Sequence, residues 1–282
     1  MSIVKFSRTL LLILSATVIL LFGFVLAGIC SPDAGSSTQS DQKKEEIEKS
    51  KDTEDVFQDY IDPKGIELLS SVHHRKKSAK KTSLANSKRK AAPARKVIAL
   101  TFDDGPHQEY TPDILRILKE RDVKATFFVV GSMAECYPYL IRAEFRGGHT
   151  VGNHTYHHQK LSELTPEEIQ QEIKVCDDSI ERITGVKAKF FRPSGGNYNG
   201  QVVSIAHSLG YSMILWSVDP CDIANPGVEE IVNRIMRRAS NGGVILLHDG
   251  VRQTIDALPA IIEVLKSRGY EFVTIDELMS LK

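Results

Sequence analysis

The chain has 282 residues, long enough for one large domain with further segments, and its 36 Lys and Arg balance 36 Asp and Glu. Because the net charge is zero, the composition as a whole indicates neither an acidic nor a basic partner, and charge has to be examined segment by segment. Four scattered cysteines and the lack of any C-x-x-C pair exclude a disulfide-rich scaffold and a zinc knot. Buried free thiols are the favoured interpretation, with a Cys136 to Cys176 bridge as the alternative in an oxidising compartment.

The N-terminal segment, residues 1–30, is predicted to be a transmembrane anchor or a signal peptide. Residues 10–29 are uncharged and mostly apolar, the length that a helix needs to cross a bilayer, and Lys5 and Arg8 precede them. Positive charge on this side would keep the N-terminus in the cytoplasm. A cleaved signal peptide and a lipoprotein at Cys30 are the alternatives. All three place the rest of the chain outside the cytoplasm, either at the cell membrane as a single-pass protein or secreted.

Residues 31–94 are predicted to be a disordered charged linker, because Ser, Lys, Glu, Asp and Gln dominate and aromatic residues are scarce. Its first part leans acidic, whereas residues 75–96 contain ten Lys or Arg and no Asp or Glu. We interpret this basic run as solvated linker, and the sharper hypothesis is that it associates with anionic lipid or an acidic wall polymer. No reading helix or aromatic stacking motif accompanies it, so we expect no nucleic-acid partner.

Residues 95–282 alternate short apolar runs with helical patterns, which predicts an α/β domain. The expected strands are 97–102, 125–130, 149–153, 188–192, 211–217, 243–248 and 271–275. Helices are expected to open at Thr111-Pro112, Thr165-Pro166 and Asn225-Pro226, where a capping residue precedes a proline that suits the first turn. This alternation implies parallel strands with right-handed crossovers, in a barrel or a doubly wound sheet. Seven units favour a distorted (β/α) barrel with about seven parallel strands.

Polar side chains gather where the predicted strands end, which is where both architectures place reactive groups. They are Asp103 and Asp104 after the first strand, His154 and His158 after the third, Arg192 at the end of the fourth, Asp219 and Asp222 after the fifth, and His248 with Asp249 at the end of the sixth. Adjacent strand residues point to opposite faces, so Asp103 and Asp104 can serve one centre only where the strand breaks, and Gly105-Pro106 supplies a break. Two close carboxylates raise each other's pKa unless a cation lies nearby, which favours a metal.

The two histidines supply further metal ligands. His154 and His158 are four residues apart and are expected to share one side of a helical turn. Two imidazoles and one carboxylate form a three-ligand catalytic site for zinc or a similar divalent ion, with a position left for water. Each piece alone has a simpler explanation, since Asp-Gly-Pro is ordinary turn chemistry and His149 and His157 show that histidine is common here. The combination across separate strand ends favours the metal site.

Five motifs follow one another through residues 95–280: TFDDGP (101–106), HTYHH (154–158), RPSGG (192–196), DPCDI (219–223) and LLHD (246–249). In order and spacing they resemble the polysaccharide deacetylases, also called carbohydrate esterase family 4 or the NodB homology group. The resemblance implies a NodB-like barrel and a metal-dependent hydrolase acting on carbon-nitrogen bonds other than peptide bonds. It also implies one divalent ion, with zinc first and cobalt, nickel or manganese as alternatives.

The resemblance implies roles for the residues at the first and third strand ends. Asp103 would be the general base, and the metal ligands would be Asp104, His154 and His158. The cation would polarise the acetamide carbonyl and a water, and Asp103 would take the proton of that water. The attack yields a tetrahedral oxyanion.

The later motifs complete this set. By resemblance His248 would be the general acid that protonates the departing amine, and Asp222 would orient it and keep it cationic. Arg192 would hold Asp103 ionised and in place by a charge-assisted pair.

Two positions depart from the family's pattern and concern substrate binding. Gly195 stands where the family often has an aromatic residue, but its backbone N–H, which would help to bind the oxyanion, is kept. Ile223 stands where the family tends to have Trp, and with Leu246 it would still wall a pocket for the acetyl methyl group. The shape of this pocket leaves the preferred sugar open.

Other residues near the motifs have less defined expectations. Asp219 is either part of an ion-pair network or directly involved, and Asp249 is given no catalytic role. Three aromatic side chains either line the groove or belong to the core: Trp216, Tyr156 and Tyr198.

We therefore expect a monomeric, membrane-anchored hydrolase that removes N-acetyl groups from N-acetylglucosamine residues of a cell-wall polysaccharide and releases acetate. Peptidoglycan is the favoured substrate. Chitin-oligosaccharide and acetylxylan deacetylases of the same family are the alternatives. A non-catalytic wall-binding module is a hypothesis of another class. Asp103 beside the ligand set argues against it, because a binding protein has no need of a base.

Overall fold

The computed structural model describes residues 95–281. The predicted anchor or signal peptide (residues 1–30) and the predicted linker (residues 31–94) lie outside these residues, so both remain predictions. Within the described part, no helix combines the length and the apolar character that crossing a bilayer requires.

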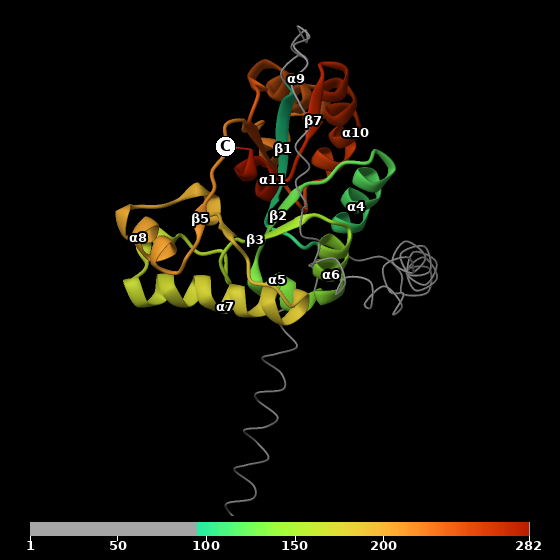
Figure 1. Ribbon diagram of the computed structural model, residues 1–282. Helices are drawn as coiled ribbons and strands as arrows, with labels where there is room; N and C mark the ends of the chain where they lie inside the picture. Colours follow the sequence, from blue (N-terminus) through green and yellow to red (C-terminus); the bar gives the residue numbers. More distant parts are fainter. Residues whose placement is uncertain (1–94, 282) are drawn as a thin grey trace, which may run out of the picture. The chain divides into compact units, whose positions relative to one another are not determined.

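Seven parallel strands form one sheet at the centre of the described chain (Figure 1). They are β1 (Lys96–Asp103), β2 (Thr126–Val129), β3 (Thr150–Asn153), β4 (Phe190–Phe191), β5 (Ser212–Met213), β6 (Gly243–His248) and β7 (Tyr270–Phe272). The order across the sheet is β5-β4-β3-β2-β1-β6. Strand β7 pairs with residues 96–98 at the start of β1. Strand β2 pairs with residues 101–103 of β1, on the same side as β7. The predicted α/β fold with seven parallel strands is confirmed, as a curled half-barrel.

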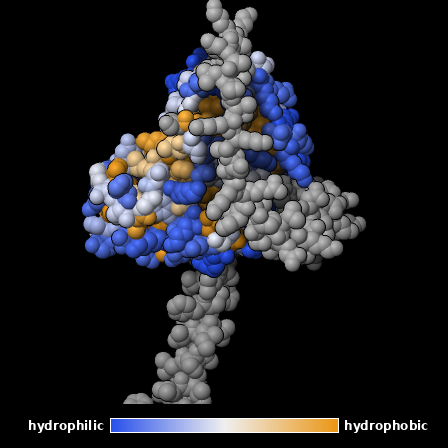
Figure 2. Space-filling model, viewed as in Figure 1, coloured by the Kyte–Doolittle hydropathy of each residue, from blue (hydrophilic) through white to orange (hydrophobic). Residues whose placement is uncertain are grey.

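Helices connect the strands and cover the sheet. Those of the described residues are α4 (Tyr110–Glu120), α5 (Gly131–Cys136), α6 (Pro138–Arg146), α7 (Pro166–Thr184), α8 (Gly200–Ser208), α9 (Val228–Arg238), α10 (Arg252–Ser267) and α11 (Ile275–Ser280). In Figure 1, α4, α6 and α10 lie on one side of β1 and β2, and α7 and α8 lie beside β3 and β5. Figure 2 shows hydrophilic residues along the outer faces of α4 and α7. The helices therefore turn their apolar faces to the sheet, as amphipathic surface helices do.

The alternation of side chains along β1 decides what faces the inside of the curl. One set of alternate residues packs against the helices outside the sheet: Ile98, Leu100 and Phe102. The other set packs with residues of α11: Val97 and Ala99. Because the side-chain period of a strand is two, Thr101 and Asp103 face the same inner side as Val97 and Ala99. This places the first aspartate of the TFDD motif inside the curl.

Two of the three predicted helix starts are wrong. The start at Thr165 is confirmed, with a capping box between Thr165 and Glu168. Helix α4 begins at Tyr110, because the hydroxyl of Thr111 donates to Asp249 instead of capping a helix. Helix α9 begins at Val228, beyond the predicted Asn225-Pro226.

Three predicted strands are clearly too long, and of the predicted strand 188–192 only Phe190–Phe191 pairs as a strand. Only Ser212–Met213 of the predicted strand 211–217 pairs as a strand, because the segment then turns away toward β6 and bridges it at Val218. The predicted strand 271–275 ends at Phe272, since Thr274 forms a capping box that opens α11.

The thiol of Cys176 is free and buried, and it donates to the carbonyl oxygen of Val129. This excludes the alternative bridge between Cys136 and Cys176. Cys221 is free and exposed, so the expectation of buried free thiols holds for Cys176 and is wrong for Cys221.

Glu144, on α6, is a buried acidic residue whose carboxylate has no hydrogen-bond partner among the described residues. Its side chain is 0% exposed, and neither carboxylate oxygen has a hydrogen-bond partner among residues 95–281. Burial, with repulsion from Asp249 as a second cause, raises the pKa of Glu144 well above its ordinary value of 4.5. The folded protein therefore keeps a proton that the unfolded chain has already released, and stability from this site is lost as pH rises from 4.5 toward the raised pKa.

We predict that Glu144→Leu raises the free energy of unfolding at pH 8 by about 1–3 kcal/mol, because it removes a buried acid without partners. At pH 5 the gain should be smaller, since the wild-type carboxyl is then protonated at little cost. Urea denaturation at both pH values measures this difference. Glu263→Leu, on the exposed side of α10, is the control and should show no such pH dependence. An equal gain at pH 5 and pH 8 for Glu144→Leu would contradict the explanation.

Candidate active site

The carboxyl ends of β1, β3 and β6 and the segments after β4 and β5 meet at one pocket. It is lined by Asp103, Asp104, His154, Gly195, Gly196, Trp216, Asp219, Cys221, Ile223, Leu246 and His248. The side chains that were predicted from separate strand ends therefore lie together, as parallel strands require. His158, Arg192 and Asp222 lie beside this lining and bond to members of it.

The two aspartates reach the pocket through a sharp change in backbone conformation. Strand β1 ends at Asp103, and Asp104 has a φ of 71° in the left-handed region. The break in the extended chain comes at Asp104 itself, one residue before the predicted Gly105-Pro106. A glycine is needed at position 105 for a steric reason, because a Cβ there would lie 2.5 Å from an oxygen of Asp249.

Asp104, His154 and His158 each offer a ligand atom, and these atoms lie within 4.8 Å of one another. Oδ1 of Asp104 lies 3.3 Å from Nε2 of His154 and 3.0 Å from Nε2 of His158. The predicted helical turn is wrong, since residues 154–158 form no helix and Thr155 and His158 have φ angles of 70° and 58°. A left-handed turn brings the imidazoles together instead, with ring centroids 5.1 Å apart.

The surroundings of this group suit a divalent cation. Nδ1 of His154 lies 2.8 Å from the carbonyl oxygen of Arg192, and a carbonyl only accepts, so Nδ1 donates and Nε2 keeps its lone pair toward Asp104. Burial would raise the pKa of Asp104, but the two neighbouring imidazoles, His154 and His158, outweigh burial and hold that pKa well below its ordinary value. An ionised carboxylate and two Nε2 atoms are a donor set that zinc or a similar ion prefers.

Arg192 holds Asp103. The guanidinium is 0% exposed and donates to Oδ1 of Asp103 at 2.6 Å and to Oγ1 of Thr101 at 2.9 Å. Its Nε donates to the carbonyl oxygen of Ile214 at 3.1 Å. Burial lowers the pKa of Arg192, and the Asp103 carboxylate opposes that shift. The other carboxylate oxygen of Asp103 faces the metal-ligand group, 3.7 Å from Nε2 of His154.

Asp222 and His248 form a second buried pair. Oδ1 of Asp222 accepts from Nδ1 of His248 at 2.7 Å, and Oδ2 accepts from the backbone N–H of His248 at 2.8 Å. Burial would lower the pKa of His248, but the bond to Asp222 and its charge raise it above the ordinary value. The reverse holds for Asp222, whose pKa burial would raise and His248 lowers. Because Nδ1 is bonded to Asp222, Nε2 is the ring atom left for the pocket.

Strand register brings the two halves of the site together. Asp103 on β1 and His248 on β6 are direct partners in the parallel ladder, and both face the inside of the curl. Neighbouring strands lie about 4.8 Å apart. The predicted base and the predicted acid therefore stand on either side of the same small space.

The three residues predicted to bind substrate all line the pocket. Leu246 is buried at its floor, whereas Ile223 is 60% exposed at its rim. Gly195 has a φ of 57°, and no atom lies within 4 Å of where its Cβ would be, so the space beside it is open. Gly196 packs against Trp216 so closely that a Cβ would come 2.4 Å from the indole ring.

The remaining polar candidates separate into two groups. Asp219 lines the pocket and accepts from the backbone N–H of Cys221 at 2.6 Å. Asp249 points away from it, with Oδ2 accepting from Thr111 and burial raising its pKa to about 7. Tyr156 bonds Glu135 at the surface and takes no part in the pocket lining.

The two further histidines of this region have structural partners. Nδ1 of His149 accepts from the backbone N–H of Ala125 at 3.1 Å, and burial lowers the pKa of His149 to about 3. His157 bonds Glu172 through Nδ1 at 2.6 Å, so its ring is turned from the metal-ligand group. His157 and His158 are adjacent in sequence, and the presence of histidine alone does not distinguish the structural residue from the candidate ligand.

Sequence reasoning missed several residues that support the site. Thr101 bonds Arg192, and Thr155 bonds both Ser194 and the backbone N–H of His158. Thr254 donates to Asp222. The sequence could have indicated that Thr101 lies near the site, since it is two residues before Asp103 and therefore on the same face of the strand.

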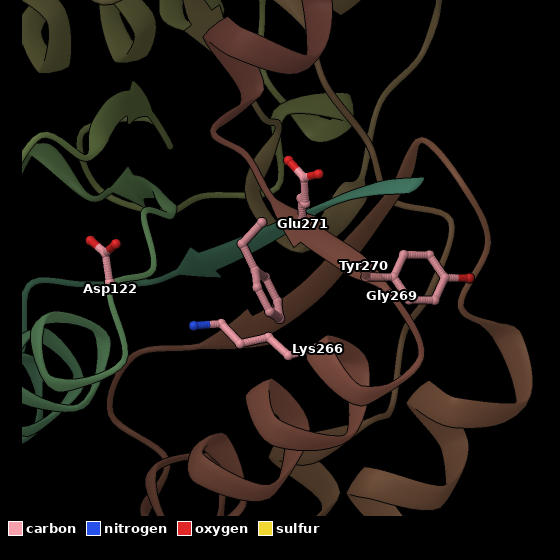
Figure 3. Close-up of a pocket in the computed structure, with 6 residues that line it drawn as sticks. Asp122, Lys266, Gly269, Tyr270 and Glu271 are labelled. Carbon is pink, nitrogen blue, oxygen red and sulfur yellow. The ribbon is translucent and has the colours of Figure 1, made fainter. Parts of the chain in front are cut away.

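A second hollow lies at the opposite end of β1 (Figure 3). Its lining residues are Asp122, Lys266, Gly269, Tyr270, Glu271 and Phe272. Among residues 95–281 the group of Asp104, His154 and His158 is the one that could hold a metal, and it lies in the first pocket. The pocket at the carboxyl ends of the strands is therefore the candidate active site.

Comparison with known proteins adds independent information. A family model described as polysaccharide deacetylase matches residues 90–214. A peptidoglycan-N-acetylglucosamine deacetylase of Bacillus cereus is 42% identical over 192 residues, which cover 66% of this chain and 90% of that protein. The peptidoglycan-N-acetylmuramic acid deacetylase PdaC of Bacillus subtilis is 39% identical over 190 residues, which cover 67% of this chain but 40% of that protein.

A solved structure of PdaC from Bacillus subtilis superimposes with a TM-score of 0.63 at 39% sequence identity, covering 67% of this chain and 92% of that chain. The likeness in sequence and the likeness in structure thus each cover about two thirds of this chain.

We predict that His158→Ala weakens binding of Zn²⁺ or Co²⁺ by at least about 100-fold, because it removes one of three ligand atoms. His157→Ala, one residue earlier, should leave metal affinity within about threefold, since that ring bonds Glu172. Isothermal titration calorimetry on the metal-free protein measures both. Equal losses in the two variants would show that the ligand group is wrongly assigned.

Proposed function

Because this chain belongs to the polysaccharide deacetylase family, we propose that it removes N-acetyl groups from N-acetylglucosamine residues of peptidoglycan and releases acetate. The family consists of hydrolases that act on amide bonds of polysaccharides and depend on a metal. The observation that supports activity in this chain is the pocket itself, where a held carboxylate, a held imidazole and a metal-ligand group face one another.

The residues that would hold the metal are Asp104, His154 and His158, and we propose zinc, with cobalt, nickel or manganese as alternatives. When bound, the ion would supply a Lewis acid at the amide carbonyl and would favour deprotonation of water. The donor set of two imidazoles and one carboxylate leaves a position open for substrate.

Asp103 is proposed as the general base. Arg192 fixes one carboxylate oxygen, so the other is free to accept a proton from the attacking water. The Arg192 pair keeps Asp103 in a single orientation, which a base that acts on one water needs. A protein that only binds the wall would gain nothing from this arrangement, and we therefore favour an enzyme over a binding module.

His248 is proposed as the general acid. Asp222 accepts the hydrogen of Nδ1, so the proton passed to the departing amine comes from Nε2. The raised pKa keeps His248 protonated at higher pH than a free imidazole. Since His248 stands opposite Asp103 across the strand pair, base and acid would reach the two sides of one amide bond.

The pocket wall is proposed to receive the acetyl methyl group. Leu246 and Trp216 provide apolar surface, and Ile223 extends it to the rim. The open space at Gly195 leaves its backbone N–H accessible as a donor for the oxyanion. Chitin oligosaccharides and acetylxylan would present the same acetyl group and are the alternative substrates.

We also propose that the protein acts outside the cytoplasm and as a monomer. The apolar stretch at residues 10–29, which lies outside the described residues, supports an extracytoplasmic enzyme held at the cell membrane or secreted after cleavage. Peptidoglycan would then be the nearest acetylated polymer. We propose that the chain acts as a monomer, because each predicted catalytic group comes from the same chain.

The metal-loaded protein is expected to release acetate from peptidoglycan faster than from chitin oligomers or acetylxylan. Acetate is measured by an enzyme-coupled assay on the three substrates at matched acetyl content. Asp103→Asn should lose about 10²–10⁴-fold in rate while still binding the polymer, as loss of a general base requires. No acetate from any of the three substrates would reject the proposed function, and a preference for chitin oligomers or acetylxylan would redirect it.

Asp222→Asn is predicted to move the alkaline fall of kcat/KM to lower pH. The acid must be protonated to act, and Asp222 raises the pKa of His248, so loss of the charge lowers the pH at which His248 deprotonates. Rate profiles between pH 5 and pH 10 test this. Asp219→Asn removes a charge from the same loop without touching His248 and should leave the alkaline limb in place. An unchanged limb in Asp222→Asn would exclude His248 as the titrating acid.

A further inference from the structure

We propose that Thr254 is a positioning residue for the reaction, because its hydroxyl fixes the Asp222 carboxylate that orients His248. The inference deepens the proposed function and rests on it. Thr254 lies near the start of α10 and is 0% exposed. It is neither one of the residues that line the pocket nor a member of the metal-ligand group, and its hydroxyl reaches Asp222.

The hydrogen bonds around Asp222 define this role. Oγ1 of Thr254 lies 2.5 Å from Oδ2 of Asp222, and a carboxylate only accepts, so the hydroxyl donates. The two other donors to this carboxylate are Nδ1 and the backbone N–H of His248. Bonds to an ionised acceptor are about twice as strong as neutral ones.

The hydroxyl of Thr254 connects the Asp222 carboxylate to α10, a third element beside η4 and β6. Without its hydroxyl, both remaining donors come from His248, so Asp222 and His248 could shift together and keep their mutual bonds. Asp222 itself lies in the short 3-10 helix η4 (Asp222–Ala224), which is flanked by Cys221 and Asn225 with φ angles of 55° and 50°. Arg234 of α9 holds the backbone of this loop at Pro220, but the bond from another helix to the Asp222 carboxylate itself comes from Thr254 of α10.

The first turn of α10 holds this loop at two separate places. Gln253, next to Thr254, accepts from the backbone N–H of Gly227 through Oε1 at 2.8 Å. That bond secures the loop after η4 without touching the Asp222 carboxylate. The chain thus offers a neighbouring residue that separates general loop support from orientation of the carboxylate.

Three variants test the inference in the full metal-loaded protein. Thr254→Val replaces the hydroxyl by a methyl group, Thr254→Ser keeps the hydroxyl, and Gln253→Ala removes the separate loop contact. Thr254→Val is expected to lower kcat about 10–100-fold, the loss expected for a hydrogen bond to a charged group, with KM and metal content unchanged. Thr254→Ser and Gln253→Ala should stay within about threefold of the wild type. Thr254→Ala is the second variant without a hydroxyl, should Thr254→Val fail to fold.

A second readout does not depend on turnover. The proton on Nδ1 of His248, bonded to Asp222, should give a downfield proton NMR signal in the wild type, Thr254→Ser and Gln253→Ala. In Thr254→Val this signal should move upfield or broaden, because the carboxylate is no longer fixed. If the wild type released no acetate, the proposed function would fail while the NMR comparison still decided the role of Thr254.

The inference is overturned by either of two results. One is a Thr254→Val protein that keeps both kcat and the Nδ1 signal. The other is an equal loss in Thr254→Ser and Thr254→Val, which would assign the effect to packing of the side chain and not to its hydroxyl.

Discussion

The arrangement of the site depends on one buried cation. The guanidinium of Arg192 has no exposure to solvent, and its cost of burial is offset only because Asp103 and several oxygen acceptors surround it. Its plane lies over the ring of Phe128, 4.1 Å from the centroid. The backbone carbonyl of the same residue accepts from His154 and sets which nitrogen of that ring faces the ligand group. One residue therefore connects Asp103, the proposed base on β1, with the candidate metal-ligand group after β3.

Much of this could be predicted from sequence because polar residues at strand ends in a parallel sheet converge by topology alone. The apolar run before Asp103 and the run before His248 gave both strands and hence both ends, and the strand register then makes the two residues neighbours. The capping box at Thr165 was equally local. Short-range patterns that are satisfied within a few residues were thus reliable.

Features that depend on distant partners could not be predicted in this way. Thr111 looked like a helix cap, but a carboxylate more than a hundred residues later takes its hydroxyl. The turn at His154–His158 looked helical by spacing, yet its geometry is set by bonds to residues of other segments, among them Ser194. The length of β5 depends on where the chain crosses to β6, and the sequence of β5 does not contain that information. Tertiary contacts overrode local preference at each of these places.

Left-handed backbone conformations gather around the pocket. Asp104, Thr155, His158 and Cys221 all have φ between 55° and 71° and none is glycine. Each costs of order 1 kcal/mol or more, and such residues persist only where the surroundings fix them. Thr155 shows how, since its N–H donates to Asn153 and its hydroxyl bonds Ser194. The protein thus gives up some folding free energy to aim its polar side chains at one space.

The two ends of β1 lie in different surroundings. The chain enters at Lys96, beside β7, and the pocket lies past Asp103, at the other end of an eight-residue strand. At about 3.3 Å per residue, entry point and pocket are roughly 23 Å apart along the strand. The start of β1 therefore lies on the side of the domain away from the pocket, and residues at this end of the strand do not contribute to the pocket lining.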